Sequence, residues 1–351
     1  MNSNNHLVVM AGGVGSRFWP MSTPECPKQF IDVLGVGKTL LQLTVDRFEG
    51  CIPKSNIWVV TSASYFDMVK GQLPFVADDH ILLEPCMRNT APCIAYVTWK
   101  IKSRYPDAVM AVTAADHLVI DTAEFKRVAD KGLAFVAGND RIMTLGMIPS
   151  RPETGYGYIK SNDVFVGEPL KVAEFKEKPD YETAVKYINE GKYYWNAGIF
   201  FWDVRTIEAA LRANAADIAA VFDSLEQSLY TDREQEAVNA EFPTCRSISI
   251  DYAVMEKAPN VYVLPASFGW SDLGTWGSLH NQLDHDGQNN SSVGGNVKFV
   301  ESSNCIVRMP EGKDVVIQGL DGYIVAESNG SLLICRLQDE QRIKEFSAKL
   351  K

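Results

Sequence analysis

The sequence predicts an α/β fold with a mixed, mainly parallel sheet, followed by a small β-rich tail. Over roughly the first 150 residues, short apolar runs alternate with longer stretches that have helical spacing. The short runs are apolar on both faces, which is typical of strands covered by helices on both sides. Beyond residue 288, short β-like runs recur, punctuated by Gly, Asn and Asp.

Each element of the first part follows from its local pattern. The apolar runs predict strands at residues 7–10, 57–61, 81–83, 108–112 and 142–146. Apolar residues at helical spacing predict helices at residues 40–48, 91–103 and 124–137. The polar stretch 206–240, rich in Ala, Glu and Asp, is expected to form a surface insertion. Because ligands of such sheets bind beyond the carboxyl ends of the strands, residues that follow a strand are the first candidates for a site.

The tail begins after a polar, turn-rich segment at residues 284–292. We place a domain boundary there, which divides the chain into 1–287 and 288–351. The runs of the tail predict strands at residues 296–300, 304–308, 315–317, 323–327 and 331–335. A helix starting at Glu340 is expected to close the tail.

Composition and charge restrict the function classes. Of the 351 residues, 46% are hydrophobic and 22% are charged, as in ordinary globular enzymes. The 34 basic and 44 acidic residues give a net charge of −10, which disfavours a nucleic-acid partner. A phosphate-rich substrate would therefore need a local cluster of Arg and Lys, or a metal ion.

The N-terminus and the cysteines predict a cytoplasmic protein. The N-terminus lacks the basic segment of a signal peptide. No run approaches the ~18 apolar residues that span a membrane, so no membrane partner is expected. Seven cysteines occur without a C-x-x-C pair, which favours reduced thiols over a disulfide framework or a zinc site.

A glycine-rich loop follows the first strand and predicts phosphate binding. Three glycines within four positions let backbone N–H groups turn toward a phosphate without obstruction by Cβ atoms. Arg17 and Lys28 add positive charge for a polyphosphate. The loop is not the dinucleotide fingerprint, because Phe18 stands at the third glycine position. The expected phosphate-binding residues are Ala11, Gly12, Gly13, Gly15, Ser16, Arg17 and Lys28.

A second glycine-containing segment, Gly35–Thr39, imitates the end of a P-loop. The first glycine of a P-loop would fall at position 32, which is Asp32. We therefore interpret Lys38 and Thr39 as a turn that caps the helix beginning near Leu40.

Further motifs follow in order along the chain. They are Phe18–Pro20, Pro27–Phe30, Glu84–Pro92, Asp116–His117, Thr154–Ile159, Phe175–Pro179, Trp195–Phe200 and Gly269–Trp276. Together with the glycine-rich loop they resemble the signature of the sugar-nucleotide pyrophosphorylases over roughly residues 7–280. The Phe-Trp-Pro and Pro-Lys-Gln-Phe details resemble the branch of that family that makes GDP-mannose.

This resemblance implies a Rossmann-like nucleotidyltransferase domain and a tail similar to a short left-handed β-helix. In relatives such a tail can mediate dimers, so a homodimer is expected. The implied reaction transfers GMP from GTP to α-D-mannose 1-phosphate and releases pyrophosphate, with Mg²⁺ or another divalent cation. The length of the chain predicts a single activity, without the isomerase domain that related bacterial enzymes often carry.

Two other functions stay open. One is a pyrophosphorylase for another hexose or heptose 1-phosphate, because sugar choice depends on few hydroxyl contacts. The other is a catalytically silent subunit that senses nucleotide sugars. The presence of Arg17, Lys28, Asp116 and Asp272 disfavours the silent subunit.

The resemblance also implies roles for single residues at the nucleotide. Asp116 and Asp272 would hold the metal ion, although Ala114 stands where the family usually has proline. Glu84 and Asn89 would read the base, because a carboxylate can accept from both N1–H and N2–H₂ of guanine. Arg88 would either bind phosphate or pair with Glu84.

The sugar side is assigned in the same way. Gly155 would offer backbone contacts to the hexose, Glu177 and Asn196 would bind its hydroxyls, and Lys178 would neutralise its phosphate. The alternative is that Glu177 and Lys178 form a solvated pair and that Asn196 caps a turn. His117 is expected to be structural. Asp251 is expected to cap a helix at residues 252–257.

Overall fold

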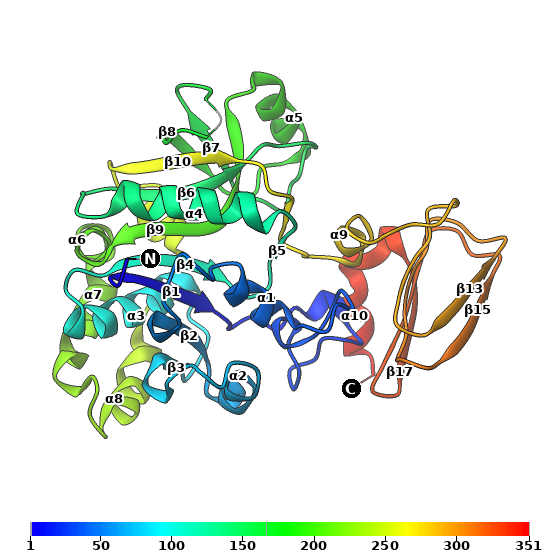
Figure 1. Ribbon diagram of the computed structural model, residues 1–351, viewed down its shortest axis with the longest axis horizontal. Coiled ribbons are helices and arrows are strands. Elements are labelled where there is room, and N and C mark those ends of the chain that lie inside the picture. The colour runs from blue at the N-terminus through cyan, green and yellow to red at the C-terminus, as the bar shows by residue number, and fades with distance from the viewer. Residues whose placement is uncertain (1, 166, 351) are drawn as a thin grey trace. The chain divides into compact units, whose positions relative to one another are not determined.

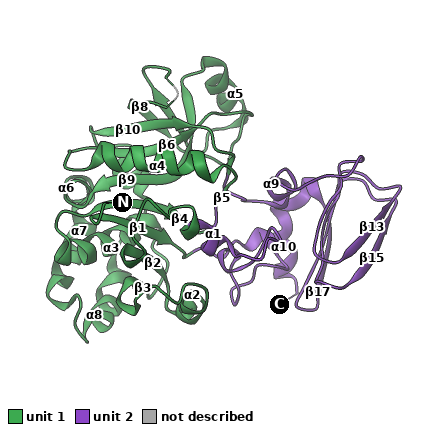
Figure 2. Cartoon of the chain, in the orientation of Figure 1, with its two compact units in different colours: residues 1–12, 45–115, 119–270 green, residues 13–44, 116–118, 271–351 purple. Residues whose placement is uncertain are grey.

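The computed structural model describes residues 2–165 and 167–350 (Figure 1). They divide into two compact units (Figure 2). Unit 1 comprises the chain up to residue 12 with residues 45–115 and 119–270. Unit 2 comprises residues 13–44 and 116–118 with the chain from residue 271 onward. The boundary predicted between residues 287 and 288 stays a prediction.

The predicted strands form, and the described residues contain further strands that the sequence analysis did not predict. The strands are β1 (Asn5–Met10), β2 (Ile57–Ser62), β3 (Ile81–Glu84), β4 (Val109–Ala114), β5 (Leu118–Val119), β6 (Ile142–Met147), β7 (Tyr158–Ser161), β8 (Leu170–Lys176), β9 (Tyr193–Asp203), β10 (Val261–Ala266), β11 (Trp270–Ser271), β12 (Ser291–Val293), β13 (Asn296–Val300), β14 (Ile306–Arg308), β15 (Asp314–Gln318), β16 (Tyr323–Ser328) and β17 (Ser331–Arg336). All five strands predicted before residue 150 are confirmed, and so are the five of the tail.

The helices confirm the predicted α/β alternation. They are α1 (Leu40–Asp46), α2 (Phe66–Gln72), α3 (Thr90–Arg104), α4 (Thr122–Val136), α5 (Tyr181–Glu190), α6 (Val204–Asn214), α7 (Ala216–Leu225), α8 (Glu234–Glu241), α9 (Trp276–His280) and α10 (Ile343–Ala348). Thr39 caps α1 as predicted, because its hydroxyl accepts from the N–H of Gln42 at 3.3 Å. No helix among the described residues has the length and apolar character needed to cross a membrane.

The main sheet of unit 1 is mixed. Among the described residues its strand order is β3-β2-β1-β4-β9-β6-β10-β8-β7. β3, β2, β1 and β4 run parallel, whereas the long strand β9 pairs antiparallel with β4 and β6. α4 packs on β4, β9, β6 and β10, and α3 packs on β1 and β2.

The expected surface insertion at 206–240 is wrong. α6 and α7 pack against α3, and α8 packs against α7. Phe222 and Val238 are fully buried in the same apolar cluster as Val8 of β1. The polar composition hides apolar residues that recur at helical spacing, such as Ile207 and Leu211, and these bury one face of each helix.

The carboxyl ends of the parallel strands carry the predicted nucleotide residues. Gly12 follows β1, and Glu84 is the last residue of β3. The chain passes into unit 2 after Gly12 and again after Ala115, just beyond β4. The sequence motifs therefore sit at the strand ends where α/β sheets bind ligands.

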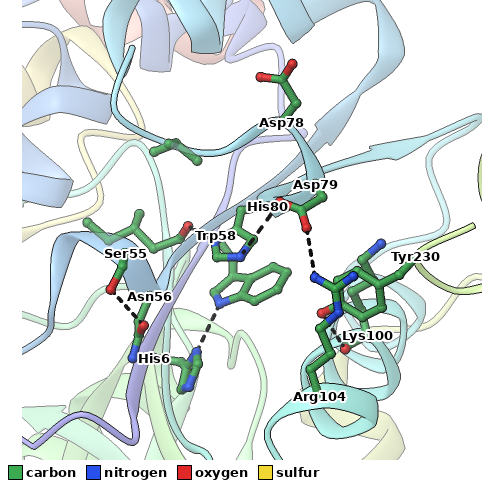
Figure 3. A network of polar contacts seen from close by, with 12 residues as sticks. His6, Ser55, Asn56, Trp58, Asp78, Asp79, His80, Lys100, Arg104 and Tyr230 are labelled. Carbon is green, nitrogen blue, oxygen red and sulfur yellow. Dashed lines mark hydrogen bonds and ion pairs between the residues drawn. The ribbon is translucent and has the colours of Figure 1, made fainter.

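A polar and aromatic network lies at the amino ends of the same strands (Figure 3). Trp58 Nε1 donates to His6 Nδ1 at 3.1 Å, and the Trp58 ring stacks on His80 with centroids 3.6 Å apart. Arg104 donates to Asp79 at 3.2 Å. Burial, with the neighbouring His80, lowers the pKa of His6 to about 4, and burial also lowers the pKa of His80. The neutral form of His6 therefore predominates at pH 7, as its acceptance of the Trp58 hydrogen bond requires.

The tail is built largely from parallel strand pairs. β12, β14 and β16 pair in parallel, β13 pairs in parallel with β15, and β17 closes one edge antiparallel to β16. A 3₁₀ segment at Leu337–Arg342 leads into α10, which confirms the predicted closing helix.

The tail and the glycine-rich loop share one apolar core within unit 2. The ring of Phe18, next to the loop, lies 5.3 Å from that of Trp276 and is buried. Ile343 of α10 is fully buried in the same cluster. Its other buried members are Met21, Val33, Leu40, Leu118, Leu273, Leu279, Ile306, Ile324, Ala326, Leu333 and Cys335. The packing of the tail therefore supports the loop that is predicted to bind phosphate.

We expect Ile343→Ala to lower the free energy of unfolding by about 2–5 kcal/mol, because it opens a cavity in this shared core. Urea denaturation followed by circular dichroism measures the change. Val316→Ala is the matched control: Val316 is 69% exposed on β15, so its loss should change stability by less than about 0.5 kcal/mol. Equal effects of the two substitutions would contradict the shared core.

Candidate active site

The glycine-rich loop turns sharply at Gly15. Gly15 has φ 71°, in the left-handed region, and precedes a 3₁₀ turn at Ser16–Phe18. A Cβ atom at Gly15 would lie 2.6 Å from the Cβ of Lys28, whereas one at Gly13 would meet nothing within 4 Å. Gly15 is therefore needed for both its conformation and its close approach to Lys28. Arg17 is exposed, so its guanidinium is accessible to a ligand.

Lys28 is a buried cation held by three acceptors within unit 2. Its side chain is 3% exposed, and its Nζ lies 2.8 Å from Asp116 Oδ2. The same Nζ donates to the backbone oxygens of Asp272 at 3.1 Å and of Leu273 at 2.9 Å. An ammonium group has three hydrogens, so these contacts use its full donor capacity.

The two predicted metal ligands both adjoin Lys28. Burial by itself raises the pKa of Asp116, but the charge and hydrogen bond of Lys28, with a contribution from His117, hold that pKa below its usual value. Asp272 Oδ1 accepts from the N–H of Gly274 at 2.8 Å, and a Cβ atom at Gly274 would lie 2.6 Å from Oδ2. His117 lies beside Asp116, with Nε2 3.9 Å from Oδ1, and its expected structural role stays a prediction.

These carboxylates fit a divalent cation. Their oxygens are the hard ligands that Mg²⁺ prefers, and Mg²⁺ commonly takes one or two carboxylates together with waters and substrate phosphates. The ammonium of Lys28 already places a positive charge beside Asp116. Among the described residues, no three or more His, Cys, Asp and Glu side chains form a group that could hold a metal ion.

Glu84 is a buried carboxylate with an unpartnered oxygen. It is 8% exposed at the end of β3, and its Oε1 has no hydrogen-bond partner among the described residues. A Cβ atom at Gly12 would lie 3.6 Å from its Oε2, so Glu84 faces the start of the glycine-rich loop. Burial raises the pKa of Glu84 to about 7, although a hydrogen bond with Cys93 opposes the shift. A buried acceptor of this kind is costly unless a ligand supplies donors.

The neighbours of Glu84 have other partners. Asn89 caps α3, because its Oδ1 accepts from the N–H of Thr90 at 2.9 Å, and its backbone has φ 67°. The guanidinium of Arg88 donates to the backbone oxygen of Pro243, and the two roles proposed for it stay predictions.

The predicted sugar residue Asn196 lies in a polar network of unit 1. Its Oδ1 accepts from the hydroxyl of Thr144 and from the N–H of Gly198, each at 3.1 Å. These two donors orient the amide, so its Nδ2 donates to Asp251 Oδ1 at 3.0 Å. Burial, with the nearby charge of Glu177, raises the pKa of Asp251 to about 6.

The expected capping role of Asp251 is wrong. Asp251 is the first residue of a short π-helical turn, Asp251–Met255, rather than the residue before it. Ser249 performs the capping, because its hydroxyl accepts from the N–H of Tyr252 at 3.4 Å. Asp251 therefore turns to Asn196 and joins the predicted sugar residues. Ser249, two positions before Asp251, was the signal in the sequence that could have identified the capping residue correctly.

The remaining predicted sugar residues have internal contacts. Lys178 pairs with Glu177, with Nζ 2.5 Å from Oε1; the lysine side chain is 61% exposed, whereas that of Glu177 is 14% exposed. The N–H of Gly155 donates to Glu153 at 3.0 Å. A Cβ atom at Gly157 would lie 2.5 Å from Glu177 Oε2, so that position keeps Glu177 close to the backbone.

The fold and these carboxylate and lysine groups define a class of protein. A family model described as nucleotidyl transferase matches residues 6–289, so the chain belongs to the nucleotidyl transferase family.

Particular relatives refine this class. The chain is 37% identical over 354 residues to the alginate biosynthesis protein AlgA of Pseudomonas fluorescens, covering 98% of this chain and 71% of that protein. It is 34% identical over 359 residues to the mannose-1-phosphate guanylyltransferase of Escherichia coli K12, covering 98% and 73%. A crystal structure described as mannose-1-phosphate geranyltransferase from Thermus thermophilus matches with a TM-score of 0.90 and 28% identity over 99% of each chain. The resemblance seen in the motifs is therefore confirmed.

Gly15→Ala should destabilise the protein by at least about 1–2 kcal/mol, because the left-handed backbone and the contact with Lys28 both exclude a Cβ atom. Gly13→Ala is the control, since its Cβ atom meets nothing within 4 Å. Thermal unfolding of the two variants beside the unaltered protein measures the difference. A melting temperature of the Gly15 variant equal to that of the Gly13 variant would contradict this account of the loop.

Proposed function

We propose that the protein transfers GMP from GTP to α-D-mannose 1-phosphate and releases pyrophosphate. The buried carboxylate of Glu84, with its unpartnered Oε1, is the observation that carries the choice of base. Guanine offers two adjacent donors on its Watson–Crick edge, and adenine and the pyrimidines offer no such pair. The names of the relatives support the choice of sugar phosphate.

The chemistry needs positioning and charge neutralisation more than proton transfer. A phosphate oxygen of the sugar phosphate, already anionic at neutral pH, attacks the α-phosphorus of GTP in line. A bond forms from that oxygen to phosphorus, and the bond to the bridging oxygen breaks. Pyrophosphate leaves with the electron pair of that bond. No general base is required, so Arg, Lys and carboxylate groups suffice for the site.

We assign the charged residues on this basis. Arg17 and Lys28 neutralise the triphosphate, and Lys178 neutralises the sugar phosphate. Asp116 and Asp272 hold Mg²⁺ or another divalent cation. When bound, the cation neutralises phosphate charge in the transition state. The backbone of Ala11, Gly12, Gly13, Gly15 and Ser16 surrounds the phosphates.

The contacts with the base and the sugar follow the same assignment. Glu84 and Asn89 read the guanine, and Gly155, Glu177 and Asn196 bind the hexose. Asp251 joins this group because it shares a hydrogen bond with Asn196.

We also infer that the tail is a short left-handed β-helix and that the protein is a homodimer. Parallel pairing in successive coils supports the β-helix: Asn296 aligns with Asp314, and Ile306 aligns with Ile324. Leu332 and Ile334 support self-association, because they are 53% and 58% exposed on the edge strand β17.

The assignment of the reaction is tested by pyrophosphate release. The purified protein with Mg²⁺, GTP and mannose 1-phosphate should turn over faster than with any other pairing of a nucleoside triphosphate and a sugar 1-phosphate. The sugar panel should contain glucose, galactose and heptose 1-phosphates. Absence of turnover with GTP and mannose 1-phosphate would refute the proposal, and faster turnover with another sugar would reassign the substrate.

The base assignment predicts a pH dependence. The ionised form of Glu84 accepts both guanine donors, and its pKa of about 7 means that this form is depleted as the pH falls. Between pH 8 and pH 6 the ionised fraction drops about tenfold, so kcat/KM for GTP should fall by about that factor.

Glu84→Gln provides the reference for this profile, because it removes the titrating group and leaves the titration of GTP itself. Its profile should be flatter, and its preference for GTP over dTTP should be lost. Glu168→Gln, at a glutamate whose side chain is 68% exposed, should behave as the unaltered protein. An intact GTP preference in the Glu84 variant would exclude Glu84 from base reading.

A further inference from the structure

We infer that Lys28 and the divalent cation compete for the carboxylate of Asp116, so that Lys28 acts as an internal counter-ion of the metal site. The inference rests on the proposed function, which assigns Asp116 to the metal. It adds that the ammonium must leave Asp116 before its charge can serve a phosphate.

The donor capacity of Lys28 carries the first step. Its Nζ contacts Asp116 Oδ2 at 2.8 Å and donates to the backbone oxygens of Asp272 and Leu273 at 3.1 and 2.9 Å. With three hydrogens and three acceptors, the ammonium can bind a phosphate oxygen only by giving up one of these partners.

The exposure of the partners shows which contact can exchange. The side chain of Asp116 is 33% exposed, whereas that of Lys28 is 3% exposed. A cation from solvent can therefore approach the carboxylate of Asp116 directly. The two backbone oxygens belong to consecutive residues of one turn, and the buried side chain of Leu273 fixes that turn in the core. The contact with Asp116 is the one that can be lost without moving the turn.

Electrostatics then makes the two cations competitors. A fixed positive charge 2.8 Å from a carboxylate oxygen repels a divalent cation that approaches the same group. Binding of the metal alone is therefore opposed by Lys28. A phosphate that enters with the metal offers Lys28 a replacement anion, so the metal and the nucleotide should bind together more readily than the metal alone.

The test measures Mn²⁺ binding to the full chain without nucleotide, by the electron paramagnetic resonance signal of free Mn²⁺. Lys28→Gln removes the charge and keeps an amide that can donate to the two backbone oxygens. It should bind Mn²⁺ at least about tenfold more tightly than the unaltered protein, because the repulsion is gone. Lys28→Arg keeps the charge and should bind Mn²⁺ as weakly as the unaltered protein. Lys54→Gln, at a lysine whose side chain is 67% exposed, is the surface control and should change nothing.

The outcomes separate this inference from the proposed function. Equal or weaker Mn²⁺ binding by Lys28→Gln would overturn the competition and leave the metal assignment in place. If adding Asp116→Asn to Lys28→Gln leaves the tight binding unchanged, the carboxylate under competition is not Asp116, and the inference fails. Absence of pyrophosphate release by the unaltered protein with GTP would refute the proposed function and would not decide the competition, which the Mn²⁺ measurements test separately.

A measurement on the unaltered protein covers the case in which the variants do not fold. A lysine-specific acylating reagent followed by peptide mass spectrometry reports the accessibility of Lys28. Saturating Mn²⁺ should increase the labelling of Lys28 several-fold and leave that of Lys54 unchanged. Labelling of Lys28 that does not respond to Mn²⁺ would overturn the competition.

Discussion

The buried ammonium of Lys28 is the constraint on which the arrangement of unit 2 around the glycine-rich loop depends. A charge that is 3% exposed is costly unless charged and polar acceptors surround it. Asp116 supplies the opposite charge, and the turn at residues 272–273 supplies two backbone oxygens. Three segments far apart in the sequence are thereby fixed around one nitrogen atom. The positive φ of 44° at Leu273 belongs to this arrangement, because that turn aims its backbone oxygen at Lys28.

The same constraint explains why the β-rich tail packs with the glycine-rich loop. The turn that holds Lys28 runs directly into α9, and Gly277 at the start of α9 donates to Glu340 of the tail at 2.7 Å. Trp276 packs beside Phe18, so the loop and the turn are anchored in one apolar core. The packing of the tail therefore supports both the glycine-rich loop and the turn that holds Lys28.

Local patterns in the sequence were enough to predict most of the fold. Contacts between segments that lie far apart in the sequence could not be predicted from those patterns. The five strands predicted before residue 150 and the cap at Thr39 follow from short-range alternation and from side-chain chemistry, so the sequence alone predicted them. The burial of Phe222 and Val238 depends on helices packing against α3, which their polar composition conceals. The three acceptors of Lys28 and the turn of Asp251 toward Asn196 also depend on residues far along the chain. Only the structure brings those residues together.

Two buried charged groups illustrate how the overall charge of −10 is compatible with a phosphate-rich substrate. The ammonium of Lys28 already has three partners within the protein. It can bind a phosphate oxygen only when one of these partners is replaced. Glu84 has an oxygen without a partner, so it favours a ligand that brings donors. A free lysine in place of Lys28 would attract any anion, including the phosphates of other nucleotides. Because Lys28 is paired with Asp116, its ammonium is released only when a cation binds to Asp116. The pairing therefore favours a nucleotide that carries a divalent metal ion over an anion without one.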